Sequence, residues 1–292
     1  MRFALLTAIA LACTCANAQF GSLLDLGRKA LDKKQQLETA NKEFTNDEEI
    51  ALGEGIAAAF LGAAPLHHDQ NLQRYVNRVG RWVAMHGERP DLPWTFGVID
   101  TETINAFAFP GGMVIVSSGL LKKLNSESEL AGALAHEVAH VVKRHQIQAI
   151  QSQASTDFWT GLAQDVAVDR VGRSGGGALA QAAKQKLVDM GADLVKSGFI
   201  LRPLDRALEY EADRMAIVIA ARSGYDPYGL VAVLQMLAQA QGDGDGASVF
   251  ATHPAPGDRI TELERLGPSV FDRYGTQPQV EGRFKQVVGA AK

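Results

Sequence analysis

Residues 136–140 read His-Glu-Val-Ala-His, the HExxH pattern, inside a stretch that we predict to be helical over residues 126–148. His136 and His140 are four positions apart, so a helix projects both imidazoles from one face, about 5–6 Å apart at Cβ. Two imidazoles at that separation can bind one Zn²⁺, and Glu137 is then placed to take a proton from water on the metal. The alternative is two histidines on a solvated helix face. With only 7 histidines in 292 residues, the pattern favours the metal site.

A catalytic zinc needs three protein ligands and one open position, so a third ligand must come from elsewhere in the chain. Glu209 and Asp213 are four residues apart in a helix predicted over residues 203–224, and they therefore share one face. That face also carries three small residues, as close approach to another helix requires: Ala212, Ala216 and Ala220. We assign Glu209 as the third ligand and Asp213 as the acceptor of a ligand imidazole's N–H. Glu211 points elsewhere. The alternative is a solvated first turn in which acidic residues suit the helix dipole.

The N-terminus has the pattern of a bacterial signal peptide over residues 1–18. Arg2 precedes an apolar run that is too short to span a bilayer, and Ala16-Asn17-Ala18 fits a cleavage site. Both cysteines, Cys13 and Cys15, lie in this segment, so the mature chain would have no thiol to bind zinc or form a disulfide. We predict export to the periplasm. The alternative is an outer-membrane lipoprotein with its lipid on Cys13.

The periodicity of the remaining chain predicts an α+β fold that is mainly helical, with a small sheet beside the HExxH helix. An N-terminal arm covers residues 19–45, and one larger segment that contains the HExxH helix covers residues 46–267. The predicted helices within it include 46–61, 69–86 and 256–266, another helix opens at Pro227, and the predicted strands are 94–99 and 113–117. Pro110-Gly111-Gly112 marks a turn between the strands.

Two further segments have distinctive compositions. Residues 151–200 are rich in Gln, Ala, Gly and Ser, and we read them as a mobile helical insert or lid, the alternative being mobile surface alone. Residues 268–292 are read as a polar tail. The formal charge of −4 gives no reason to expect nucleic-acid binding.

One predicted strand is a candidate for substrate binding. An extended peptide can add to an exposed strand edge, and such binding recognises the backbone of the peptide more than its side chains. We therefore list the apolar residues of strand 113–117 as candidate substrate-binding residues: Met113, Val114, Ile115 and Val116. The alternative is an ordinary strand in the core.

The order of several motifs resembles one family of enzymes. HExxH followed by Glu209-Tyr210-Glu211-Ala212-Asp213 is similar to the bacterial zinc metallopeptidases of the BepA, LoiP and HtpX type, relatives of the prenyl-protein proteases. Residues 72–80, 105–112 and 130–137 match this family in the same order, as does Thr252-His253-Pro254. The similarity covers about residues 46–266. It is closest to single-domain periplasmic members of the LoiP type, because no repeat domain or membrane helices are present.

The resemblance implies that residues 46–267 form a zinc metallopeptidase domain of the zincin-like type. It implies one zinc per chain on His136, His140 and Glu209, with Glu137 as general base. It also implies that His253 can reach the zinc from a lid loop as a fourth ligand and hold the site closed. The alternatives for His253 are a donor to the oxyanion and a plain surface turn.

Three functions follow from these patterns. The first is a periplasmic zinc metalloendopeptidase that hydrolyses misfolded or unfolded envelope proteins. The second is a largely latent zinc protein that acts as a chaperone or assembly factor, with outer-membrane proteins or their assembly machinery as partners. The third is a structural zinc site. Such a site fills the coordination of the metal with four protein ligands and needs no general base, so the presence of Glu137 argues against it.

Overall fold

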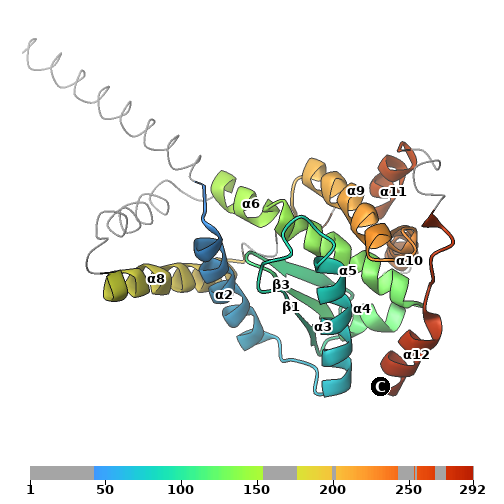
Figure 1. Cartoon of the computed structure of the whole chain (residues 1–292), viewed down its shortest axis with the longest axis horizontal. Coiled ribbons are helices and arrows are strands. Elements are labelled where there is room, and N and C mark those ends of the chain that lie inside the picture. Colours follow the sequence, from blue (N-terminus) through green and yellow to red (C-terminus); the bar gives the residue numbers. More distant parts are fainter. Residues whose placement is uncertain are drawn as a thin grey trace, which may run out of the picture. The chain divides into compact units, whose positions relative to one another are not determined.

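The computed structural model describes residues 43–153, 176–198, 202–242, 253, 255–266 and 274–291 (Figure 1). Its helices are α2 (Asn46–Ala63), α3 (Gln70–Ala84), α4 (Ser118–Lys123), α5 (Glu127–Val142), α6 (His145–Gln153), α8 (Gly176–Lys196), α9 (Arg206–Arg222), α10 (Gly229–Gly242), α11 (Pro256–Glu264) and α12 (Glu281–Ala290). Its strands are β1 (Thr95–Ile99), β2 (Ala106–Phe109) and β3 (Met113–Ser117). The predicted α+β class, mainly helical with a small sheet, is confirmed. The expected signal peptide lies outside the described residues.

The three strands form one sheet in the order β1-β3-β2. Strand β3 pairs parallel with β1 and antiparallel with β2. The turn between β2 and β3 uses Gly111 and Gly112, whose φ angles of 83° and 108° favour glycine. Strand β3 ends at Ser117, and the chain continues through α4 into α5.

The expectation that Met113, Val114, Ile115 and Val116 form an exposed edge strand is wrong. β3 is the central strand, and its backbone is paired on both sides. Its side chains are buried except Met113, which is partly buried. This strand therefore has no free edge on which a peptide could add.

Helix α5 is the centre of the fold, and every one of its residues is buried. It contacts the sheet through β2 and β3, and it also packs against α3, α9 and α10 (Figure 1). The hydroxyl of Ser126 caps its N-terminus by accepting from the N–H of Glu129 at 3.1 Å. The carboxylate of Glu129 reaches one residue further back and accepts from the N–H of Asn125 at 2.7 Å.

Helix α5 ends earlier than the predicted boundary of residue 148. It stops at Val142, and a new helix, α6, begins at His145. Between them Arg144 has a φ of 58°, a left-handed conformation that is uncommon for a residue with a side chain. Its guanidinium donates to the carbonyl of Phe44 and pairs with Glu49, a carboxylate with an exposed fraction of 0%. These contacts, made with a distant part of the chain, hold the break.

The insert expected over residues 151–200 is described only in part, and residues 154–175 lie outside the described residues. Its helix α8 packs closely on α2, where a Cβ on Gly191 would lie 2.5 Å from the carbonyl oxygen of Leu52. The role of the insert as a lid stays a prediction. None of the described helices is both long and apolar enough to cross a membrane.

The segment expected as a polar tail contains helix α12, which packs on α3 and α5. Phe284 is buried in the core, and the guanidinium of Arg283 pairs with Glu127 in the first turn of α5. This packing is hard to predict from the sequence, because Phe284 is the one aromatic side chain of α12.

The close crossing of α5 and α10 gives a stability prediction. A Cβ on Gly132 would lie 2.5 Å from the backbone nitrogen of Leu230, so Gly132→Ala forces the helices apart. We expect the free energy of unfolding of the metal-free protein to fall by about 1–3 kcal/mol, measured by urea unfolding. Gly62→Ala is the control, because a Cβ there meets nothing within 4 Å. Equal stability of Gly132→Ala and wild type would contradict the tight crossing.

Candidate metal centre

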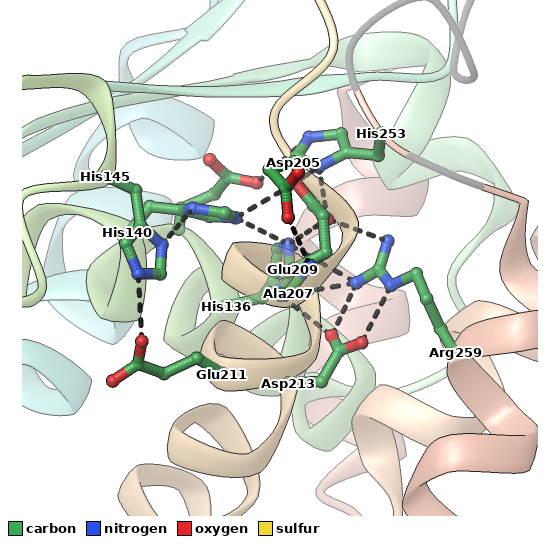
Figure 2. A network of polar contacts seen from close by, with 11 residues as sticks. His136, His140, His145, Asp205, Ala207, Glu209, Glu211, Asp213, His253 and Arg259 are labelled. Atoms are coloured by element: carbon green, nitrogen blue, oxygen red, sulfur yellow. Dashed lines mark hydrogen bonds and ion pairs between the residues drawn. The ribbon is translucent and has the colours of Figure 1, made fainter. Parts of the chain in front are cut away.

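The two histidines and the glutamate expected as metal ligands come together between α5 and α9 (Figure 2). The Nε2 atoms of His136 and His140 are 3.0 Å apart. The Glu209 carboxylate lies 3.5 Å from His136 Nε2 and 3.6 Å from His140 Nε2. All three side chains are buried, with exposed fractions of 0–5%.

These distances fit a zinc ion. For Zn–N bonds of 2.0–2.1 Å, two ligand atoms of a tetrahedral site are about 3.3–3.4 Å apart. The observed separations of 3.0, 3.5 and 3.6 Å lie on either side of that value. The donors are two imidazoles and one carboxylate, the set that zinc accepts at catalytic sites.

The approach of α9 to α5 follows from small side chains. The three alanines noted above, at 212, 216 and 220, each have an exposed fraction of 0%, and α5 has its most extensive helix contact with α9. Asp205 caps α9 by accepting from the N–H of Ala207 at 2.8 Å, so Glu209 lies in the first turn of the helix. The dipole of that turn also favours a carboxylate.

Asp213 lies behind His136, where its Oδ1 is 2.9 Å from Nδ1 of the imidazole. The guanidinium of Arg259 pairs with the same carboxylate through two bonds, Nε to Oδ2 at 2.8 Å and Nη2 to Oδ1 at 2.5 Å. Burial alone would raise the pKa of Asp213, but Arg259 and His136 outweigh it and hold this pKa well below its usual range. Asp213 is therefore a carboxylate that can accept from His136 and fix its tautomer.

Arg259 was not predicted from the sequence as part of the site. It is buried on α11 with an exposed fraction of 4%. Its guanidinium also lies 3.6 Å from Glu209 and next to the ring of His136. A signal was present, since Arg259 is four positions before Leu263, so it lies on the apolar face of its helix. A charged residue on such a face needs a buried partner.

His253 lies against the three ligands. Its Nδ1 is 2.9 and 3.0 Å from the two oxygens of Glu209, and its Nε2 is 3.9 Å from Glu137. One ligand atom from each of His136, His140, Glu209 and His253 lies within 4.8 Å of the others. The exposed fraction of its side chain is 13%, the largest of the four.

The charges of the cluster set its titration in the metal-free state. Burial and Arg259 both lower the pKa of His136, but Asp213 and Glu209 outweigh them and raise it to about 9. Burial also lowers the pKa of His140 well below its usual value, so His140 is neutral. The carboxyl of Glu209 is held ionised against its own burial by His253, His140 and His136.

Residues 70–266 match peptidase family M48. The chain belongs to peptidase family M48. The match confirms the resemblance to metallopeptidases of the BepA and LoiP type and the zincin-like metallopeptidase domain.

Named relatives of this M48 chain include bacterial and mitochondrial proteins. The beta-barrel assembly-enhancing protease of Escherichia coli (strain K12) is 30% identical over 226 residues, which cover 77% of this chain and 45% of that protein. The protein of the same name from Yersinia pestis is 30% identical over 231 residues, with the same coverage. The mitochondrial metalloendopeptidase OMA1 of Schizosaccharomyces pombe is 31% identical over 205 residues, which cover 70% of this chain and 55% of that protein. The chain spans about half the length of these curated relatives.

The raised pKa of His136 gives a prediction for zinc binding. A ligand imidazole must be neutral, so zinc has to displace the proton that His136 carries below pH 9. We expect zinc affinity to rise about tenfold per pH unit between pH 7 and 9, measured by competition with a chelator. Asp213→Asn should lower the pKa of His136, so the increase of zinc affinity with pH should level off at a lower pH than in wild type.

A buried aspartate away from the site provides the control for this measurement. Asp226 has an exposed fraction of 6% and accepts from the N–H of Tyr228. Asp226→Asn should keep the pH dependence of wild type. A zinc affinity that does not change between pH 7 and 9 would contradict the protonated state of His136.

Proposed function

We propose that this M48 chain is a periplasmic zinc-dependent metalloendopeptidase that hydrolyses peptide bonds of misfolded or unfolded envelope proteins. One observation carries the proposal: His136, His140 and Glu209 offer ligand atoms within 4.8 Å of one another, and Glu137 lies beside them. One zinc on these three residues leaves an open position for chemistry. When bound, the zinc would act as a Lewis acid and lower the pKa of water at the open position to about 7.

Glu137 is the residue that moves the proton. Burial raises the pKa of its carboxyl and Glu209 adds to this, whereas His253 and His136 lower it, and the net direction is upward. A general base works best when its pKa lies near the working pH. Glu137 takes a proton from the attacking water and passes it to the leaving amine.

The substrate strand must be placed differently from the sequence-based expectation. Within the described residues β2 pairs with β3 alone, so β2 is an edge of the sheet, and it contacts α5. We propose that an extended substrate adds along β2, next to Glu137. Its backbone then aligns with the catalytic residues by main-chain hydrogen bonds.

We expect a cavity beside this edge to give the enzyme a preference for one kind of substrate side chain. It has a volume of about 50 Å³, and its lining is mainly apolar. The lining residues are Ile104, Asn105, Ala106, Leu120, Ala133, His136, Glu137, Leu230, Val233, Leu234, Leu237, His253 and Arg259. A cavity of this size suits a small apolar side chain of the substrate.

The proposed location and substrates rest on the N-terminal sequence and on the relatives. The pattern of residues 1–18 supports export, and the name of the Escherichia coli relative concerns β-barrel assembly in that organism. An enzyme that binds the substrate backbone along a sheet edge accepts unfolded chains of varied sequence. Misfolded envelope polypeptides fit that requirement, and outer-membrane proteins are one such class.

The role of Glu137 gives the test of this function. Glu137→Gln removes the base and keeps the shape, so we expect casein cleavage to fall by about 10²–10⁴-fold while one zinc per chain remains bound. Cleavage is followed by gel and zinc by metal analysis of the same sample. Glu54→Gln on the surface of α2 is the control and should cleave as wild type does. A Glu137→Gln protein that cleaves casein at the wild-type rate would refute the mechanism.

A second candidate function is favoured by the position of His253. Its Nδ1 lies 2.9 Å from Glu209, which places the imidazole over the ligands. A site held in this way is largely latent, and the protein then acts mainly as a chaperone or assembly factor for outer-membrane proteins. The two functions are compatible in one protein, because opening of the site would convert one into the other.

Removal of the His253 imidazole separates these roles. If His253 holds the site closed, His253→Ala should raise casein cleavage several-fold at unchanged zinc content, measured by initial rates. Binding of unfolded outer-membrane proteins, which a chaperone role requires, should be retained in Glu137→Gln. A fall in cleavage by His253→Ala would instead assign His253 to the oxyanion as a donor.

A further inference from the structure

A fourth histidine, His145, lies directly behind His140. The Nδ1 atom of His145 is 2.9 Å from Nδ1 of His140, and the two ring planes meet at 74° (Figure 2). The exposed fraction of His145 is 0%, so no water competes for this contact. His145 lies on the side of His140 that faces away from the ligand cluster.

The protons of this pair are fixed by the ligand role of His140. His140 offers Nε2 to the cluster, so its proton must be on Nδ1. That N–H then donates to Nδ1 of His145, which must be unprotonated. A neutral His145 therefore carries its proton on Nε2.

The proton on Nε2 of His145 points at a carboxylate. Oε2 of Glu211 is 3.6 Å away, and Nε2 has no hydrogen-bond partner within the described part of the chain. A shift of about 0.6 Å would complete a normal hydrogen bond of ~3.0 Å. Lys143 lies 3.4 Å from the other oxygen of Glu211 and helps to hold the carboxylate in place.

The backbone is shaped so that His145 reaches this position. In a continuous helix a residue five positions after His140 would be rotated about 140° from it. Arg144 has a left-handed conformation, with a φ of 58°, and interrupts the helix. The chain direction changes there, and this brings the ring of His145 into contact with the ring of His140. The pairing of Arg144 with buried Glu49 holds this conformation.

We propose that His145, oriented by Glu211, is a positioning residue that fixes the tautomer and ring orientation of His140 for metal binding. This inference rests on the proposed zinc function and deepens it. His136 has a carboxylate, Asp213, as its acceptor, whereas His140 has an imidazole backed by a carboxylate. Acceptors of this kind raise the affinity of a ligand imidazole for its metal.

Zinc affinity tests the hydrogen bond from His140. His145→Phe keeps a ring and removes the acceptor, so we expect zinc affinity to fall about 10–100-fold in chelator competition. His145→Gln restores an acceptor oxygen and should recover most of the loss. His67→Phe replaces a buried histidine that accepts from the N–H of Asp69, and it should bind zinc as wild type does. Unchanged affinity in folded His145→Phe overturns the proposal.

The tautomer of His145 provides a second readout that needs no variant to be stable. Long-range ¹H–¹⁵N spectra of the zinc-loaded wild-type protein distinguish an Nε2–H ring from an Nδ1–H ring. We expect Nε2–H for His145 and Nδ1–H for His140, with each ring assigned in the wild-type protein by through-bond correlation to its own backbone signals. An Nδ1–H tautomer for His145 overturns the proposal.

Both readouts are independent of proteolysis. If wild type binds zinc and does not cleave casein, the proposed function fails, and the affinities and tautomers still decide the role of His145. If wild type does not bind zinc, both the proposed function and this inference are overturned.

Discussion

Helices α5 and α9 approach closely because α9 presents alanine at every turn of the contact, and the position of each proposed metal ligand depends on that approach. The consequence is a group of ionisable side chains inside a helical core. His136, Glu137, His140, Glu209, Asp213 and Arg259 all have exposed fractions below 5%. A buried charge without a partner costs several kcal/mol, so these groups must satisfy one another. The site is therefore a single electrostatic unit and not a set of independent ligands.

Arg259 has a central place in this unit. It is the one fixed positive charge among the buried groups, and it contacts both Asp213 and Glu209. Without it, two carboxylates on one helix face would repel each other and the buried Glu137. With it, Asp213 remains ionised and can accept from His136. The arginine on α11 thus supports the ligand geometry from a third helix.

The part of the site that the sequence predicted is the part fixed by helical periodicity. HExxH and the spacing of Glu209 and Asp213 decide locally which side chains share a face, and the structure brings those faces together. Strand order could not be read in this way, because it depends on pairing across the chain, and β3 proved to be central. Strand β2 was missed because its four residues are all apolar, so they show no alternation of apolar and polar side chains. The break at Arg144 has no glycine or proline to signal it and depends on Glu49, about a hundred residues earlier.

Helix α5 is held at both ends by buried carboxylates. At its N-terminus Glu127 accepts from the hydroxyls of Tyr75 and Tyr225 at 2.6 and 2.7 Å and pairs with Arg283. At the other end Glu49 binds Arg89, which also donates to the last-turn carbonyl of Val141 at 3.1 Å. A helix restrained in this way keeps its two imidazoles in fixed positions, which favours metal binding without rearrangement. Among the described residues of the cluster His253 is the most exposed, at 13%, so we expect the site to open to a substrate on the His253 side.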